Sequence, residues 1–582
     1  MTKTVHMLAL GAVLLLATGL RVTRFDAMAP SNSDEASYLR HARFMATMAR
    51  KLGGASVPVV AADAEGVWRY VRKDDWSAKP CWLHSGFMAG SMLLFGVGDA
   101  AGAGVNVVFS LLAVWLCYLA GRRIHGPAVG LISALFLAVS FYWLLYSRGM
   151  WAEVDGVAFV LLAFVLLLPA KKLPLWRNPG LESNWQRICN AFQHPTSNIQ
   201  RPTPNVCPGS VGRWMLSVGC WMFIAGATAG LGVLCHYRLL FIIAPLGLVT
   251  IMLSSPRAWL PRLVLLAAGF FGVIALAAGL LRLVFVVSGV EAPFTGLIGA
   301  LLERYLPGGS GVEQKGMQLS NVFPFGYYVL RNQGWAMFLL TIVGTAVSIV
   351  NLGYDRRNAA VLGMVIVPLG VLCLQVWVVA RAASVLIPFV CLLGGLGAVT
   401  VWRLGEALTP PRRRLVQAAA AVLVCVAMAG NLRADARLIR NRMGHEEAAR
   451  RLTEAGAGVV YVDPESSILY GWYAPQLPYR KLWELGAGPG SVLPRGAFAV
   501  FDGQKYHMYR PGVERVAKIE RRVRAEAGAA HRVPNMTTLW PEFLLDGTQA
   551  HTLQDMLRSL RTADRGDIRS IRIYGRGVAG EG

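Results

Sequence analysis

The chain has 582 residues, of which 55% are hydrophobic and only 15% are charged. Soluble domains carry about a quarter charged residues, so this composition excludes an ordinary soluble protein and predicts a polytopic membrane protein. The net charge of +24 comes from 57 Lys and Arg against 33 Asp and Glu. The basic residues cluster between apolar segments, which is typical of membrane topology and of contact with anionic lipids. No nucleic-acid partner is therefore expected.

Apolar stretches of about 20 residues predict the transmembrane helices. The N-terminal stretch has a basic start, and a retained helix is favoured over a cleaved signal peptide because no clear cleavage site precedes Arg21. A shorter run over 86–97 predicts an interfacial or re-entrant helix. About eleven spans, within a range of 11–13, are predicted, near 5–23, 102–120, 128–146, 156–170, 214–234, 239–254, 262–281, 333–350, 360–379, 383–402 and 415–431.

The connections between these spans differ in charge from one side to the other. Every short connection on one side has a basic pair or more, whereas those on the other side carry single arginines. The positive-inside rule then puts the N-terminus in the cytoplasm. The heavy use of Arg, Ala and Gly is typical of a GC-rich bacterial source, so the inner membrane of a bacterium is the expected location. Long external loops are expected over 21–101 and 282–332.

Composition changes after Asn431, where the chain takes on soluble character. A helix is expected over 445–455, with strands over 458–462 and 498–501. Alternating helix and strand predicts a small α/β domain. The sequence thus divides into a transmembrane domain, 1–431, and an α/β domain, 432–582, which the charge pattern places in the periplasm.

An adjacent acidic pair, Asp34-Glu35, follows the first span. One interpretation is structural, because acidic residues favour the first turn of a helix. The other is catalytic, because a carboxylate can take a proton from an acceptor. The external position of the pair, beside cations of the other outer loops, favours the catalytic interpretation.

The other outer connections hold further polar groups close to membrane ends, where charges are costly and mark sites or pathways. Each has a structural alternative: a cation can anchor to headgroups, and Arg148 can pair with Glu153 or Asp155. Together they supply the acids, cations and aromatic rings that a reaction on an anionic lipid requires. These groups are Lys79, Arg148, Glu153, Asp155, His236, Tyr237, Arg238, Tyr327, Tyr328 and Arg381.

These residue types suit transfer of a group from a polyprenyl phosphate. An Asp base would take the acceptor proton, while Lys79, Arg148 and Arg381 are the candidate ligands of the departing phosphate. The expected partners are a polyprenyl-phosphate sugar donor, a lipid, glycan or protein acceptor, and membrane lipids.

The order of these motifs resembles the GT-C superfamily of integral-membrane glycosyltransferases. It is closest to the branch of protein O-mannosyltransferases and the lipid A aminoarabinose transferase. The matching motifs are Asp34-Glu35, Lys79-Pro80-Cys81, Gly121-Arg122-Arg123-Ile124-His125-Gly126, Arg148 with Glu153 or Asp155, and Arg381 to Pro388. Two departures are Cys81 in place of a second proline and His236-Tyr237-Arg238 in place of the usual basic motif.

The resemblance implies inverting transfer of a sugar from a polyprenyl-phosphate donor on the periplasmic face. It makes Asp34 the leading base and Glu35 a supporting acid, and it leaves the second acid open between Asp155 and Glu153. His236, Tyr237, Arg238, Tyr327 and Tyr328 are candidates for substrate binding. No cofactor is expected to be required, although a divalent metal on Asp34, Glu35 and Asp155 is left open.

The alternative function is a transporter or flippase of a lipid-linked sugar. Such proteins show internal repeats and helices broken at the bilayer midplane. The sequence has no evident repeat, and its polar groups gather at one face. A non-catalytic scaffold would not need acids and cations on one side.

Overall fold

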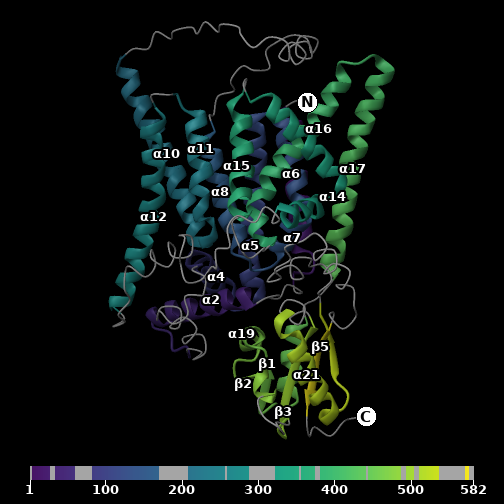
Figure 1. The fold of residues 1–582 in the computed structure, drawn as a ribbon. Helices are drawn as coiled ribbons and strands as arrows, with labels where there is room; N and C mark the ends of the chain where they lie inside the picture. Colours follow the sequence, from purple (N-terminus) through teal and green to yellow (C-terminus); the bar gives the residue numbers. More distant parts are fainter. Residues whose placement is uncertain are drawn as a thin grey trace.

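The computed structural model describes residues 3–25, 33–58, 81–168, 208–255, 258–287, 322–352, 355–373, 380–440, 444–486, 493–503, 510–535 and 570–575. The chain forms a helical bundle with a smaller α/β part at one end (Figure 1). The N-terminus lies at the opposite end of the bundle from the α/β part and the C-terminus (Figure 1).

The bundle consists of helices whose backbone polar groups are satisfied within each segment, as a bilayer requires. Six helical segments of the described residues are long and apolar enough to cross a membrane, or seven if one bent pair is a single span. Each of the eleven predicted segments overlaps a helix, but the number of crossings stays a prediction. The elements are α1 (Lys3–Val22), α2 (Ser33–Leu52), α4 (Trp82–Phe95), α5 (Asp99–Ile124), α6 (Pro127–Ala138), α7 (Phe141–Arg148), α8 (Glu153–Leu167), α10 (Pro208–Cys235), η3 (Tyr237–Ile242), α11 (Ile243–Leu253), α12 (Trp259–Val287), α14 (Val322–Val350), α15 (Arg356–Cys373), η5 (Ala380–Leu386), α16 (Ile387–Glu406) and α17 (Pro410–Arg440).

The predicted single helix over 128–146 is broken in the structure. Its two halves, α6 and α7, are bent by 58° relative to each other. Ser140 begins the second half, because its Oγ accepts a hydrogen bond from the Trp143 amide at 3.3 Å. The break also leaves the carbonyl of Ala138 outside the helical ladder, and Arg21 Nη1 donates to it at 3.2 Å.

The predicted first external loop contains helix α2, whose first turn holds Asp34 and Glu35 as the structural interpretation of that pair expected, although its length and buried face were not predicted. Helix α2 lies across the end of the bundle next to the α/β part (Figure 1). Its buried positions Ala36, Leu39, Ala42 and Ala46 recur every three or four residues. Three of them are alanines set among charged residues, so average hydropathy does not reveal the buried face. Helix α4 overlaps the short helix predicted over 86–97, and its position at the membrane interface stays a prediction.

Helices α14 and α16 cross with main chain against main chain. A Cβ at Gly344 would overlap the carbonyl oxygen of Leu393, and a Cβ at Gly397 would overlap the carbonyl oxygen of Leu340. Small residues allow this approach, which is a common way to pack helices in membranes.

The α/β part holds a five-stranded sheet in the order β2-β1-β3-β5-β4. Strand β1 pairs in parallel with β2 and β3, and β5 pairs antiparallel with β3 and β4. The preceding helix α17 runs past the predicted domain boundary at residue 431. The elements are α18 (His445–Glu454), β1 (Val459–Val462), α19 (Pro464–Tyr473), β2 (Tyr479–Lys481), η6 (Leu482–Gly486), β3 (Ala497–Asp502), α21 (Arg510–Ala527), β4 (His531–Pro534) and β5 (Ser570–Gly575).

Both faces of this sheet are covered. Val460, Val462 and Phe498 point to the face shared with α18 and α19, and Tyr461 and Phe501 point to the face shared with α21. The alternation along each strand is the period of two that a pleated strand imposes. The helix and strands predicted over 445–455, 458–462 and 498–501 correspond to α18, β1 and β3.

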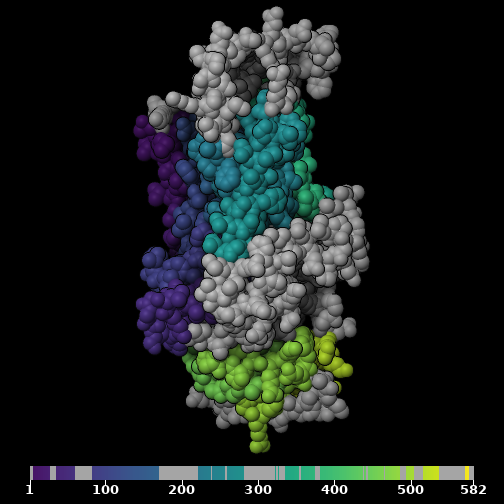
Figure 2. Space-filling view, turned by 90° about the vertical axis from the view of Figure 1, so that its left-hand side faces the viewer, coloured from purple at the N-terminus to yellow at the C-terminus, as the bar shows by residue number. Residues whose placement is uncertain are grey.

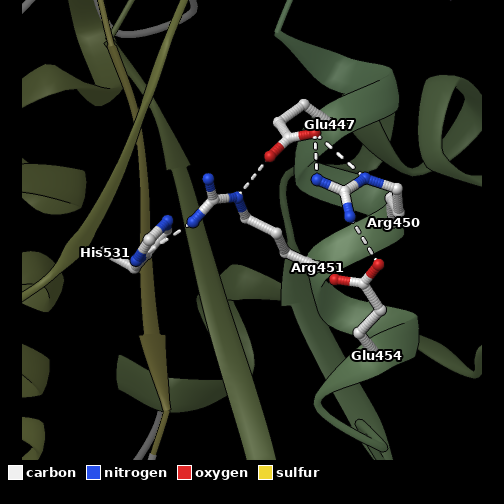
Figure 3. A network of polar contacts seen from close by, with 5 residues as sticks. All are labelled: Glu447, Arg450, Arg451, Glu454 and His531. Carbon is white, nitrogen blue, oxygen red and sulfur yellow. Dashed lines mark hydrogen bonds and ion pairs between the residues drawn. The ribbon is translucent and has the colours of Figure 1, made fainter. Parts of the chain in front are cut away.

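A polar network lies on the outer side of α18. Glu447 accepts hydrogen bonds from Arg450 and Arg451, Arg450 also binds Glu454, and Arg451 donates to His531 Nδ1 at 3.4 Å (Figure 3). The hydrogen bonds from Arg450 and Arg451 hold the pKa of Glu447 below its ordinary value. Exposed ion pairs contribute little to stability, and within this network only the Arg451–His531 contact joins α18 to β4.

We expect Gly344→Ala to force α14 and α16 apart, at a cost of about 1–3 kcal/mol for overpacking. The thermal midpoint of the detergent-purified protein should fall. The matched control is Gly430→Ala in α17, where a Cβ would meet nothing within 4 Å. Equal midpoints for the two variants would contradict the close crossing.

Candidate functional site

Polar side chains from several elements gather at the end of the bundle nearest the α/β part. Asp34 and Glu35 lie in the first turn of α2, where the helix dipole favours carboxylates. Glu153 and Asp155 lie in the first turn of α8, and Arg381 lies at the start of η5. The fold thus brings together residues that are far apart in the sequence.

Arg381 is the central cation of this group. Its Nη1 lies 2.8 Å from Asp34 Oδ2, and its Nε lies 3.4 Å from Glu153 Oε1. The guanidinium also stacks on Trp151, with 4.8 Å from Cζ to the ring centroid. A buried guanidinium must be paired to offset its lost hydration, and here two carboxylates and an aromatic face serve that purpose.

Glu153 also contacts His236, which lies between α10 and η3. His236 Nε2 is 3.2 Å from Glu153 Oε1, and both side chains are buried. The described contacts therefore join Glu153 to Arg381 and His236. Asp155, the other candidate for the second acid, has different partners.

The Met150 peptide is held on both sides. Its N–H donates to Glu35 Oε1 at 2.7 Å, and its carbonyl oxygen lies 3.0 Å from His84 Nε2. At the preceding residue, Gly149, a Cβ would collide with the Glu35 carboxylate and with the ring of Trp151. The turn between α7 and α8 thus needs glycine at this position, and Trp151 is presented to Arg381 as a result.

His84 links this turn to Asp155. Its Nδ1 lies 3.0 Å from Asp155 Oδ2, and both side chains are fully buried. A carbonyl oxygen and a carboxylate only accept hydrogen bonds, so the ring must donate from both nitrogens and is an imidazolium. Burial has the largest influence on the pKa of His84 and lowers it. The Asp155 charge, its hydrogen bond and the Met150 hydrogen bond outweigh burial and raise the pKa above 6.5.

The carboxylates differ in their access to solvent. The side chain of Asp34 is 20% exposed, against 4% for Glu153. Glu35 and Asp155 are fully buried. Among these four, Asp34 is therefore the carboxylate best placed to meet a bound molecule.

Arg148 makes different contacts from those expected. Its Nη1 donates to the main-chain oxygens of Leu20, Arg21 and Thr23 at 2.8–2.9 Å. These carbonyls lie at the end of α1, where a helix leaves acceptors unsatisfied. Neither Glu153 nor Asp155 is among its described partners, and its part in binding phosphate stays a prediction.

Several predicted site residues cannot be placed. Lys79 lies outside the described residues. Tyr237 and Arg238 belong to η3, and Tyr327 and Tyr328 belong to α14, but the side chains of all four lie outside the described part of the structure.

The three carboxylates considered for a divalent metal face different partners. Asp34 pairs with Arg381, Glu35 accepts from Met150, and Asp155 pairs with His84. In the described parts of the chain, no three His, Cys, Asp or Glu side chains form a group that could hold a metal ion. Asp34, Glu35 and Asp155 thus do not fit a shared metal site.

Two residues with clear positions here, His84 and Trp151, were absent from the predicted site. His84 follows the Lys79-Pro80-Cys81 motif by three residues, and Trp151 lies between Arg148 and Glu153. The short distance in sequence from these two residues to the motifs was the feature that could have identified them as site residues. Their contacts depend on the approach of α4 to the start of α8, which the sequence does not display.

The raised pKa of His84 makes part of the stability depend on pH. The pKa of His84 is higher in the folded protein than in the unfolded chain. The stabilisation that the protonated ring gives the fold is therefore complete below pH 6.5 and is lost as pH rises through the folded pKa. We expect the thermal midpoint to fall over this range, and His84→Gln to flatten the dependence.

The matched control for this pH dependence is His125→Gln, because burial lowers the pKa of His125 to about 4 and the ring is already neutral above pH 6.5. Its midpoint should follow that of the wild type. An unchanged slope in the His84 variant would show that the imidazolium does not stabilise the fold.

A family model described as dolichyl-phosphate-mannose-protein mannosyltransferase matches residues 80–178. This segment includes α4 to α8 and therefore His84, Trp151, Glu153 and Asp155. A search of curated proteins finds no match to the chain.

Solved structures of similar fold include two forms of ArnT and an archaeal oligosaccharyltransferase. ArnT from Cupriavidus metallidurans bound to undecaprenyl phosphate is 16% identical, with 88% of this chain and 95% of that chain covered and a TM-score of 0.51. The apo form of ArnT gives 13% identity, coverage of 87% and 94%, and a TM-score of 0.50. The apo Archaeoglobus fulgidus oligosaccharyltransferase is 14% identical, with 94% and 72% covered and a TM-score of 0.50.

At such low identity the structural similarity is one of fold, and the family-model match adds the sequence relation. The chain thus resembles dolichyl-phosphate-mannose-protein mannosyltransferases over residues 80–178, and over most of its length it has the fold of ArnT and of the oligosaccharyltransferase.

Proposed function

We propose that this chain is an inverting glycosyltransferase that moves a sugar from a polyprenyl-phosphate-linked donor to a hydroxyl or amine acceptor. The observation that carries the proposal is the Asp34–Arg381 pair at 2.8 Å. It sets a partly exposed carboxylate beside a cation that can bind phosphate. A base and a leaving-group ligand are the two groups that this reaction needs.

The reaction proceeds in one displacement. The acceptor oxygen or nitrogen forms a bond to the anomeric carbon from the face opposite the phosphate. The bond from that carbon to the phosphate oxygen breaks, and its electron pair leaves with the polyprenyl phosphate. Asp34 takes the acceptor proton, and Arg381 stabilises the charge of the departing phosphate by charge-assisted hydrogen bonds.

Arg381 has two carboxylate partners in the described structure, and a donor phosphate would compete with them for the guanidinium. Asp34 is the more exposed partner, so its exchange with phosphate would free an oxygen for the acceptor. Glu153, supported by His236, would keep Arg381 in place. Lys79 is proposed as a second phosphate ligand and Glu35 as a supporting acid.

The neighbours support the chemical class of the donor. The ArnT structure holds undecaprenyl phosphate, and we propose a polyprenyl phosphate for this chain as well. The acceptor is a lipid, glycan or protein. The family-model match does not favour the alternative of a transporter or flippase.

We expect Asp34→Asn to lower transfer by about 100- to 10,000-fold, because an amide cannot take the acceptor proton. The assay measures polyprenyl phosphate released from a panel of undecaprenyl-phosphate-linked sugars by purified protein. The matched control is Glu406→Gln, which changes an exposed carboxylate at the far end of α16. Near-normal transfer by Asp34→Asn would remove Asp34 as the base.

The proposed site faces the periplasm of a bacterial inner membrane, with the N-terminus in the cytoplasm. The two termini lie at opposite ends of the bundle (Figure 1). External protease should therefore remove a C-terminal tag in spheroplasts and spare an N-terminal one. The reverse pattern would place the site in the cytoplasm.

A further inference from the structure

Helix α19 of the α/β part belongs to two hydrophobic clusters at once. Leu469 and Trp472 lie in the cluster formed with α2 and α4. Tyr470 and Ala474 lie in the cluster that covers one face of the sheet. A helix whose opposite sides are buried in two clusters cannot shift against either without losing contacts. The position of α2 is therefore tied to that of the sheet.

Trp472 of α19 contacts both α5 and α2. Its Nε1–H donates to Asp99 Oδ1 at 2.6 Å, and the neighbouring Tyr473 hydroxyl donates to Asp99 Oδ2 at 2.8 Å. Asp99 is the first residue of α5. On the other side, Arg43 of α2 stacks on the Trp472 ring, 4.5 Å from its centroid, and donates to its carbonyl oxygen at 3.3 Å.

The same helix α2 carries the acidic pair of the candidate site. Asp34 binds Arg381, and Glu35 binds the Met150 amide. At about 1.5 Å per residue, the distance along the helix from Asp34 to Arg43 is about 13 Å. A helix is stiff over that length, so a tilt at Arg43 moves Asp34. Figure 2 shows the surface of α2, in purple, just above that of the α/β part, in green.

We propose that Trp472 is a positioning residue and that the α/β part acts as an internal clamp on α2. The clamp acts through Asp99 and Arg43 and keeps the Asp34 carboxylate against Arg381. The consequence for catalysis rests on the proposed function, whereas the effect on the position of α2 does not. The described residues of the α/β part would thus act on the site through the position of α2.

The test uses full-length protein with Trp472→Phe, which removes the donor to Asp99, and Trp472→Ala, which also removes the ring beneath Arg43. The matched control is Trp483→Phe. Trp483 packs beside the opposite face of the sheet, with Arg515 5.9 Å from its ring centroid. Thermal midpoints are measured for every variant to show that it folds. If Trp472→Ala does not fold, the conclusions are drawn from Trp472→Phe.

The first readout does not require activity. Cys81 is 3% exposed and lies in the same cluster as Leu39 and Trp472. We expect its maleimide labelling, followed by mass spectrometry of the Cys81 peptide, to rise about tenfold in Trp472→Ala because the cluster opens more often. Labelling in Trp483→Phe should equal that of the wild type. Equal labelling in a folded Trp472 variant would overturn the clamp.

The second readout is transfer from an undecaprenyl-phosphate-linked sugar that the wild type uses. Both Trp472 variants should lose about tenfold or more in kcat, because small displacements of a catalytic group are costly. Asp99→Asn also alters the contact with the Tyr473 hydroxyl, so the double variant Asp99→Asn with Trp472→Phe should lose less than the product of the two single losses, because the two substitutions share the Trp472–Asp99 hydrogen bond. Additive losses, or an unchanged kcat, would overturn the positioning role.

The two proposals fail in different ways. If the wild type transfers no sugar, the proposed function is wrong, and Cys81 labelling still decides whether the α/β part clamps α2. If the wild type is active and the Trp472 variants match it in labelling and kcat, the clamp is wrong and the proposed function stands.

Discussion

The buried guanidinium of Arg381 is the constraint on which this end of the molecule depends. A desolvated cation has to be paired, and its partners come from α2, α8 and the turn before α8. Each partner is then fixed by a neighbour: Glu153 by His236, and the turn by Glu35 and His84. The need to pair one charge thereby sets the mutual positions of helices that are distant in sequence.

The α/β part also helps to fix the positions of residues around Arg381, through its contacts with α2. Its helix α19 is buried on one side in the sheet and on the other in the cluster with α2. The bundle and the α/β part thus share the contacts of α19 beside the candidate site. This explains how a domain without a recognised catalytic motif is connected to the candidate active site.

Most of the helices and strands could be predicted from simple sequence patterns. Long apolar stretches indicate membrane helices, and alternation of apolar and polar residues indicates strands. The acidic pair and Arg381 were predicted as site residues because charges at membrane ends are costly. The choice between Glu153 and Asp155 could not be made, since both lie in one turn and only tertiary contacts separate them. The length and buried face of α2 were not predicted because that face is built largely from alanine, and the contacts of Arg148 with carbonyls leave no sequence signature.

The break between α6 and α7 has a consequence for how the protein responds to its membrane. All eight residues of α7 are buried in the protein, so this segment meets other helices and has little contact with lipid. A change in bilayer thickness acts by tilting or stretching helices at their lipid-facing surfaces. Such a change would reach the turn after α7 only through protein contacts. One such contact is the hydrogen bonding of Arg148, the last residue of α7, to the carbonyls at the end of α1.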